Sequence, residues 1–150
     1  MLYALLGSAL AAYGVLVGGL CVFQRHLLYF PNVARPELGD LAALGVREIT
    51  LKTGDGLALL SWYLPPRNAH AVIAYFHGNG GHVGYRAERL RWFARSGYGV
   101  LMAEYRGYGG NPGTPSEPGL IADGAAALDF LGGEGIAPDR LVIYGESLGS

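Results

Sequence analysis

Ser147 is the residue of this sequence best placed for covalent chemistry. It lies at the centre of the sequence Gly-Glu-Ser-Leu-Gly at residues 145–149. In a G-x-S-x-G pattern the serine can act as a nucleophile on a sharp turn between a strand and a helix, where Gly145 and Gly149 leave the necessary room. In a chain with 25 glycines, chance alone produces this pattern in roughly one sequence in six. The apolar run at residues 141–144 supports the assignment, because it predicts the strand that must precede the turn.

A second glycine-rich turn, residues 77–81 with the sequence His-Gly-Asn-Gly-Gly, follows another short apolar run. An acyl-transfer enzyme needs two backbone N–H donors for the oxyanion, one from the residue after the nucleophile and one from a loop after an earlier strand. Leu148 and Asn79 are the candidates for these two donors. Loss of one such donor lowers turnover by about a hundred- to a thousand-fold. We interpret His77 as a residue that holds its own turn by hydrogen bonds, and not as the catalytic base.

The elements that must position these turns follow from hydrophobic periodicity and turn residues. Two β-rich runs flank Gly-Asp-Gly at residues 54–56, a strong hairpin signal, so we expect the domain to begin with antiparallel strands. Strands and helices then alternate up to Ser147, which predicts an α/β fold with a mainly parallel sheet. The predicted elements are strands over 46–53, 57–64, 71–76, 99–104 and 140–144, a helix carrying Val83, Ala87, Leu90 and Ala94 that ends at Gly97, and a helix capped by Ser116 and ended by residues 132–133.

Several charged residues on the two predicted helices are interpreted as surface groups. Arg86, Arg89 and Arg95 lie largely off the apolar stripe of the first helix, so we expect solvent to surround them. Asp123 and Asp129 on the second helix are interpreted as surface carboxylates. The apolar face of that second helix is expected to consist of Leu120, Ile121, Leu128 and Leu131.

Five motifs occur along the chain in a characteristic order. They are Tyr-Phe-Pro at 29–31, His-Gly-Asn-Gly-Gly at 77–81, Tyr-Arg-Gly-Tyr-Gly at 105–109, Pro-Ser-Glu at 115–117 and Gly-Glu-Ser-Leu-Gly at 145–149. Together they resemble the amino-terminal part of membrane-tethered serine hydrolases of the α/β-hydrolase superfamily. The resemblance implies a Ser-Asp-His triad, an eight-stranded sheet, and hydrolysis of ester, thioester or amide bonds through an acyl-enzyme on Ser147. It also implies that no cofactor is used and that the loop around Arg106 is structural, with a direct contact to the substrate as the alternative role of that loop. No metal-binding residues are expected.

The catalytic acid and histidine of this fold follow the nucleophile along the chain. All four histidines, His26, His70, His77 and His82, precede Ser147. None of them matches the family's catalytic position. We therefore expect the chain to be an α/β-hydrolase fold truncated after the nucleophile turn, with an exposed sheet edge and little activity by itself.

The amino terminus is predicted to anchor the chain in a membrane. Residues 2–23 contain no Asp, Glu, Lys or Arg, and about 20 such residues can span a bilayer as a helix. The predicted organisation is a transmembrane anchor over 1–24, a juxtamembrane segment over 25–45 and the amino-terminal part of a hydrolase domain over 46–150. A cleaved signal peptide is the alternative, but no basic residue precedes the apolar run. Arg25 and Arg35 follow it, which favours a cytoplasmic catalytic domain.

The composition and the spacing of the glycines argue against several other classes of function. The net charge is −1 and the basic residues are scattered, which argues against a nucleic-acid partner. We expect a small-molecule, lipid or acyl substrate, and the sequence leaves the oligomeric state open. One alternative is a membrane-anchored binding protein without catalysis. A second is a dinucleotide-binding unit with Glu104 on the ribose, although Val83 occupies the position of the third glycine in its motif.

Overall fold

The computed structural model describes residues 1–67 and 71–150, apart from the side chain of His26. His70, one of the four histidines, lies outside the described residues. The chain forms two compact units, 1–30 and 31–150. The elements in order are α1 (Leu2–Leu28), η1 (Gly39–Leu44), β1 (Arg47–Lys52), β2 (Ala58–Leu64), β3 (Val72–Phe76), η2 (Val83–Arg86), α2 (Ala87–Arg95), β4 (Gly99–Ala103), α3 (Glu117–Gly133), η3 (Pro138–Arg140), β5 (Leu141–Gly145) and η4 (Ser147–Gly149), where η marks a 3-10 helix.

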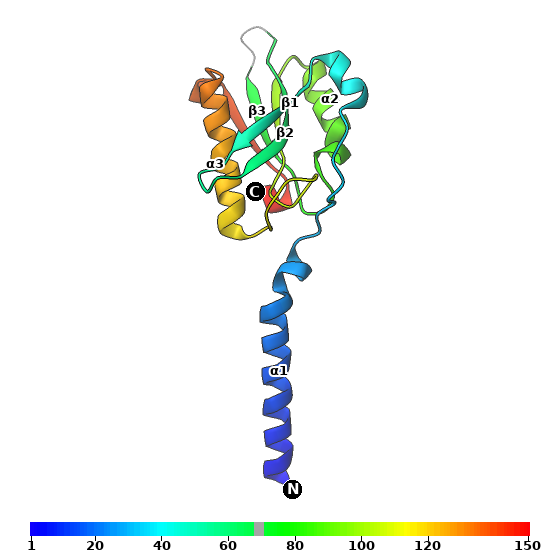
Figure 1. Cartoon of the computed structure of the whole chain (residues 1–150), viewed down its shortest axis with the longest axis vertical. Coiled ribbons are helices and arrows are strands. Elements are labelled where there is room, and N and C mark those ends of the chain that lie inside the picture. Colours follow the sequence, from blue (N-terminus) through cyan, green and yellow to red (C-terminus); the bar gives the residue numbers. More distant parts are fainter. Residues whose placement is uncertain (68–70) are drawn as a thin grey trace. The chain divides into compact units, whose positions relative to one another are not determined.

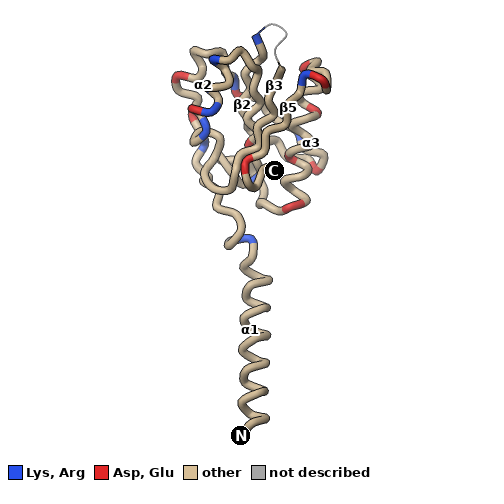
Figure 2. Tube along the Cα trace, turned by 180° about the vertical axis from the view of Figure 1, so that it is seen from behind, with Lys and Arg blue, Asp and Glu red and all other residues tan. Residues whose placement is uncertain are grey.

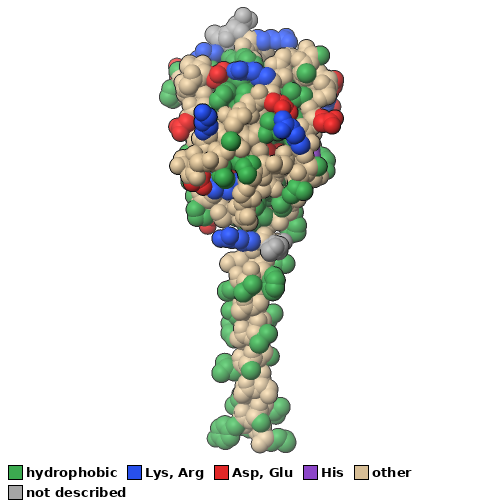
Figure 3. All heavy atoms as spheres, in the orientation of Figure 1, with side chains coloured by type: hydrophobic (Ala, Val, Ile, Leu, Met, Phe, Trp, Pro, Cys, Tyr) green, Lys and Arg blue, Asp and Glu red, His purple; other side chains and the backbone are tan. Residues whose placement is uncertain are grey.

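The first unit is built on a single apolar helix, α1. Its span Leu2–Arg25 is long and apolar enough to cross a bilayer. Figure 2 shows no charged residue along most of α1, and in Figure 3 hydrophobic side chains project from it along its length. The structure therefore contains the amino-terminal helix of membrane-spanning length that the sequence predicts.

The second unit contains a five-stranded mixed sheet in the order β1-β2-β4-β3-β5. β2 pairs antiparallel with both β1 and β4, whereas β3 pairs parallel with both β4 and β5. This arrangement confirms the predicted α/β fold with antiparallel first strands. Among the described strands β5 pairs with β3 alone, and its Val142 and Ile143 are exposed.

Helices cover both faces of the sheet, with α2 on one side and α3 on the other (Figure 1). Side chains alternate along β3, so Val72 and Ala74 join the core beneath α3 while Ile73 and Tyr75 join the core beneath α2. All five residues of β3 are buried, and this two-sided burial explains why the strand is a continuous apolar run. The layers fix the carboxyl ends of β3, β4 and β5 at one edge of the unit.

The face that α3 presents to the core differs from the prediction. Leu131 is buried as expected, but Ile121 is 67% exposed and Leu128 is also exposed. The buried stripe instead runs through Asp123 and two alanines, Ala126 and Ala127. Asp123 was wrongly interpreted as a surface carboxylate: it is 2% exposed because it accepts hydrogen bonds from Arg106. Asp129 is exposed, as predicted.

Candidate active site

Ser147 occupies a strained backbone position directly beyond the end of β5. Its φ is +51°, and it is the only non-glycine residue with a positive φ in the described part of the chain. Side chains disfavour this region of backbone space, and such strain concentrates at functional sites. Ser147 is also exposed at the start of η4. The strand, the sharp turn and the exposed serine together have the form of a nucleophile elbow.

The two glycines of the motif are required by space around this turn. A Cβ on Gly145 would lie 2.6 Å from the carbonyl oxygen of Gly149, closer than real Cβ contacts. A Cβ on Gly149 would overlap the carbonyl group of Phe76. Both glycines therefore allow backbone segments to approach one another, as the G-x-S-x-G spacing predicts.

The loop at residues 77–81, which we call the glycine loop, lies beside the serine turn at residues 145–149. β3 and β5 are adjacent parallel strands in which Phe76 pairs with Gly145, so both segments leave the same edge of the sheet. The backbone N–H of Glu146 donates to the carbonyl oxygen of Phe76 at 3.0 Å. The predicted oxyanion donors, Asn79 and Leu148, are thus carried on neighbouring segments. The side-chain oxygen of Asn79 also accepts a hydrogen bond from the Tyr108 hydroxyl at 2.9 Å.

Arg86 links the glycine loop to the serine turn, a role that the sequence analysis missed. Its guanidinium donates to the carbonyl oxygens of Gly80 at 2.9 Å and Gly78 at 3.3 Å, and to the Glu146 carboxylate at 3.3 Å. The prediction of a solvated Arg86 was wrong because the side chain folds back over the loop that precedes its helix. Arg89 and Arg95 are exposed, as predicted. The sequence signal that could have indicated this contact is the position of an arginine five residues after a glycine-rich turn.

Glu146 is held as a carboxylate by the same cluster. The Tyr75 hydroxyl donates to it, and this hydrogen bond, together with the charge of Arg86, lowers the pKa of Glu146. The pKa of Tyr75 is raised to about 12, first by burial and then by its bond to Glu146. The residue preceding the serine is therefore fixed to both β3 and the glycine loop.

His77 stabilises the glycine loop from inside the core, as predicted. Its ring is fully buried, with Nε2 2.7 Å from the Glu104 carboxylate and Nδ1 2.8 Å from the Gly78 carbonyl oxygen. The second carboxylate oxygen of Glu104 accepts the backbone N–H of Val83 at 2.8 Å. Because Glu104 is buried and both its oxygens have partners, it is not available to a ribose. This geometry removes the main support for the dinucleotide-binding alternative.

Arg106 joins the β1–β2 turn to α3. It donates through Nε and Nη2 to Asp123 at 2.9 and 2.8 Å, and through Nη1 and Nη2 to Asp55 at 2.7 and 3.1 Å. These bonds lower the pKa of Asp55 to about 2, chiefly through the guanidinium of Arg106, and the two carboxylates raise the pKa of Arg106. The contacts agree with the structural role expected for the loop around Arg106.

No described residue supplies a base to Ser147. In the part of the chain that the structure describes, the Ser147 hydroxyl forms no hydrogen bond, and Nδ1 of His82 accepts the backbone N–H of Gly84 at 3.1 Å. Within residues 1–67 and 71–150, no group of three His, Cys, Asp or Glu side chains is placed to hold a metal.

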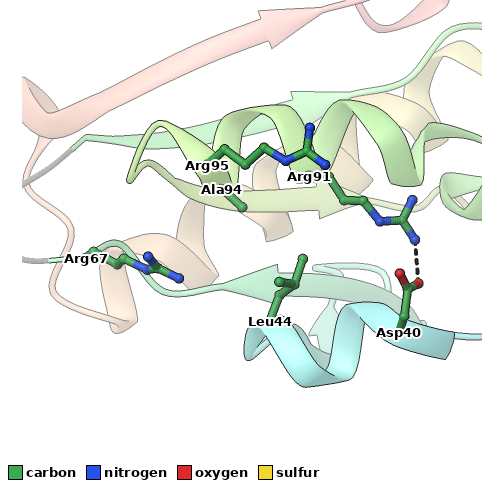
Figure 4. A pocket seen from close by; sticks show the side chains of 6 residues that line it. All are labelled: Asp40, Leu44, Arg67, Arg91, Ala94 and Arg95. Atoms are coloured by element: carbon green, nitrogen blue, oxygen red, sulfur yellow. Dashed lines mark hydrogen bonds and ion pairs between the residues drawn. The ribbon is translucent and has the colours of Figure 1, made fainter.

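A surface hollow of about 430 Å³ lies along the carboxyl half of α2 (Figure 4). None of the predicted site residues contributes to it. The residues that line it are Asp40, Leu44, Arg67, Arg91, Ala94 and Arg95.

A mixed sheet between two helical layers, with a serine elbow after β5, defines an α/β-hydrolase. The family model described as "Serine aminopeptidase, S33" matches residues 67–150, which include the glycine loop and Ser147, and the chain belongs to this family of α/β-hydrolases.

Relatives and solved structures agree with this assignment. An uncharacterized protein of Mycobacterium tuberculosis is 37% identical over 93% of this chain and 52% of its own length. The α/β-hydrolase domain-containing protein WAV2 of Arabidopsis thaliana is 34% identical over 91% of this chain and 48% of its own. The crystal structure of an α/β-hydrolase from Vibrio vulnificus superposes with a TM-score of 0.70 and 28% identity, covering 85% of this chain and 48% of that one. The chain spans about half the length of the curated relatives it matches.

Proposed function

We propose that the protein is a serine hydrolase that cleaves ester, thioester or amide bonds through an acyl-enzyme on Ser147. Membership of the α/β-hydrolases supports hydrolase activity in general. The observation that carries the specific proposal is the positive φ of Ser147 at the turn beyond β5. A strained, exposed serine between two sterically required glycines is what nucleophilic attack on a carbonyl carbon needs.

In this mechanism Ser147 Oγ attacks the carbonyl carbon while a base removes its proton. The backbone N–H groups of Asn79 and Leu148 stabilise the oxyanion of the tetrahedral intermediate. The leaving group departs with a proton, and water then hydrolyses the acyl-enzyme. Because these 150 residues cover about half of their relatives and His77 is committed to Glu104, we place the histidine and the acid outside them. By themselves, residues 1–150 would then have little activity.

We further propose that α1 anchors the protein in a membrane, with a small-molecule, lipid or acyl substrate. The length and apolar surface of α1 support this role. Arg25 and Arg35 follow the helix, which favours a cytoplasmic catalytic domain. Protease protection in sealed, right-side-out membranes tests the orientation: a cytoplasmic domain is protected until the membrane is opened.

A fluorophosphonate probe tests the chemistry, because it reacts with serines that a neighbouring base activates. The whole protein should be labelled, and Ser147→Ala should abolish the label. Ser96→Ala is the matched control, because Ser96 is an exposed serine on a different turn, and it should label as the wild type does. An unlabelled wild type that is folded would instead favour the non-catalytic binding role.

A further inference from the structure

The segment that opens the second unit lies between two loops at the candidate site. Pro31 forms a parallel bridge with Gly81, the last residue of the glycine loop. The backbone N–H of Asn32 donates to the carbonyl oxygen of Gly81 at 3.0 Å. On the opposite side, the carbonyl oxygen of Asn32 accepts the backbone N–H of Gly109 at 2.8 Å. Asn32 thus connects the loop that follows β3 to the loop that follows β4.

The side chain of Asn32 reaches the glycine loop by a second route. Its Nδ2 donates to the Tyr85 hydroxyl at 2.7 Å, and its Oδ1 accepts the backbone N–H of Ala34 at 2.9 Å. The Tyr85 ring lies against Gly81, where a Cβ would overlap it, and stacks on the His82 ring with centroids 4.6 Å apart. Gly81 is therefore bonded to the backbone of Asn32 and lies against the Tyr85 ring, whose hydroxyl accepts from the Asn32 side chain at the surface.

The glycine loop needs such support. Three of its five residues are glycines, Gly78, Gly80 and Gly81, and the last two have positive φ. Such a loop has many alternative backbone conformations, so its geometry must be fixed by contacts with other segments. An oxyanion donor works only when its N–H is aimed at the developing charge, which requires positioning to about 0.5 Å.

We infer that Asn32 is a positioning residue for the oxyanion donor of the glycine loop. All four polar groups of Asn32 have partners, and three of these partners belong to Gly81, Tyr85 and Gly109. Nearby Arg35 differs from Asn32, because it holds the same segment only to Glu48 on β1, through an exposed ion pair that does not reach the glycine loop. The residues directly after the anchor unit therefore form part of the candidate site. This inference rests on the proposed function for its catalytic consequence, but not for the loop geometry.

The test uses the whole protein with the variants Asn32→Ala, Tyr85→Phe and the double variant. Asn32→Ala keeps the two backbone bonds to Gly81 and Gly109 and removes the side-chain bonds to Tyr85 and Ala34. Because the donor acts on the transition state, this variant should lower kcat for a p-nitrophenyl ester by about three- to tenfold, with KM changed less than about twofold. Tyr85→Phe should lower kcat less, and the double variant should fall short of the product of the single effects because both changes break one connection. Val33→Ala, a change of an exposed neighbour without these contacts, should keep the wild-type kcat.

Hydrogen exchange of the backbone amides at residues 78–81 provides a readout that does not depend on activity. Asn32→Ala should speed this exchange, while Val33→Ala should not. Wild-type exchange in Asn32→Ala, or faster exchange with unchanged kcat, overturns the positioning role. If Asn32→Ala does not fold, Tyr85→Phe decides by the same two measurements. A wild type with neither fluorophosphonate labelling nor esterase activity would contradict the proposed function. Slower exchange in the wild type than in Asn32→Ala would still show that Asn32 holds the glycine loop.

Discussion

Two arginines, Arg106 and Arg86, each connect segments that lie far apart along the chain. Arg106 follows β4 and Arg86 precedes α2, and their side chains are almost equally buried, at 8% and 14% exposed. Arg106 contacts two carboxylates at 2.7–3.1 Å, one in the β1–β2 turn and one on α3. Arg86 contacts two backbone carbonyls of the glycine loop and the carboxylate of Glu146.

The contrast shows that burial alone does not tell a structural arginine from one that positions a site. Arg106 lies between two negative charges and joins secondary-structure elements, so its loss should act on folding. Arg86 joins two loops that carry proposed catalytic groups, so its loss should act on the reaction. Substitutions at each arginine or its partners can separate these roles.

The largest effect is expected for Asp123→Ala. This change leaves the guanidinium and the backbone N–H of Arg106 without buried partners, and removing one member of a buried pair costs about 3–5 kcal/mol. Urea unfolding monitored by circular dichroism measures the loss. Asp129→Ala on the same helix is the control, because an exposed carboxylate should change stability by less than about 0.5 kcal/mol. Equal losses in the two variants would contradict a special role for the Arg106 cluster.

Arg86→Gln should instead lower the rate of fluorophosphonate labelling at Ser147 by roughly ten- to a hundred-fold. The shorter neutral side chain cannot hold the Gly78 and Gly80 carbonyls and Glu146 together, so the two loops lose their common geometry. The labelling rate and the unfolding midpoint are measured on the same samples. Arg95→Gln, a change at an exposed position of α2, should match the wild type in both. If Arg86→Gln lost as much stability as Asp123→Ala and was labelled normally, Arg86 would be a structural arginine like Arg106.

The sequence predicted the framework better than these connections. The hairpin around residues 54–56, the apolar run of β3 and the Ser116 cap are local signals, and each element formed where expected. The G-x-S-x-G spacing also predicted the tight turn, because it reflects space within a few residues of Ser147. Elements whose geometry depends on a few neighbouring residues could therefore be predicted from the sequence.

Side-chain contacts between residues far apart in the chain could not be predicted in the same way. The helical periodicity of α3 gave no sign that Asp123 would be buried, since its partner Arg106 comes from another loop. Arg86 was assigned to solvent because its position relative to the helix stripe says nothing about a side chain that turns back over the preceding loop. Asn32 escaped notice for the same reason, as its partners lie far along the chain.

Tyr75→Phe sharpens the comparison by testing the second support of Glu146. It removes the hydroxyl that bonds Glu146 but keeps the ring, which stacks on Tyr144 at 5.2 Å. We expect a stability loss of about 1 kcal/mol and a smaller loss of labelling than in Arg86→Gln. The pKa of Glu146 should rise toward its usual value, because the hydrogen bond from Tyr75 is the main cause of its lowering. Labelling that falls as far as in Arg86→Gln would assign the positioning of the serine turn to Tyr75.

The smallest effect is expected from Asp55, the exposed partner of Arg106, and it depends on pH. Asp55 has its pKa lowered from 3.8 to about 2 in the folded state. Its contribution to stability is therefore fully present above about pH 4 and is lost as the pH falls toward 2. Asp55→Asn lacks this ionisation, so the gap in urea midpoint between wild type and variant should be constant from about pH 7 to 5 and should close between about pH 4 and 2.

Asp129→Asn is the control for this titration, because Asp129 is an exposed carboxylate without an arginine partner among the described contacts. Its midpoint should follow that of the wild type over the whole range. A gap for Asp55→Asn that persists unchanged down to about pH 2 would mean that the ion pair with Arg106 does not stabilise the folded state. Asp123 would then be the one carboxylate whose charge holds Arg106, and Asp55 would act through contacts that do not depend on its charge.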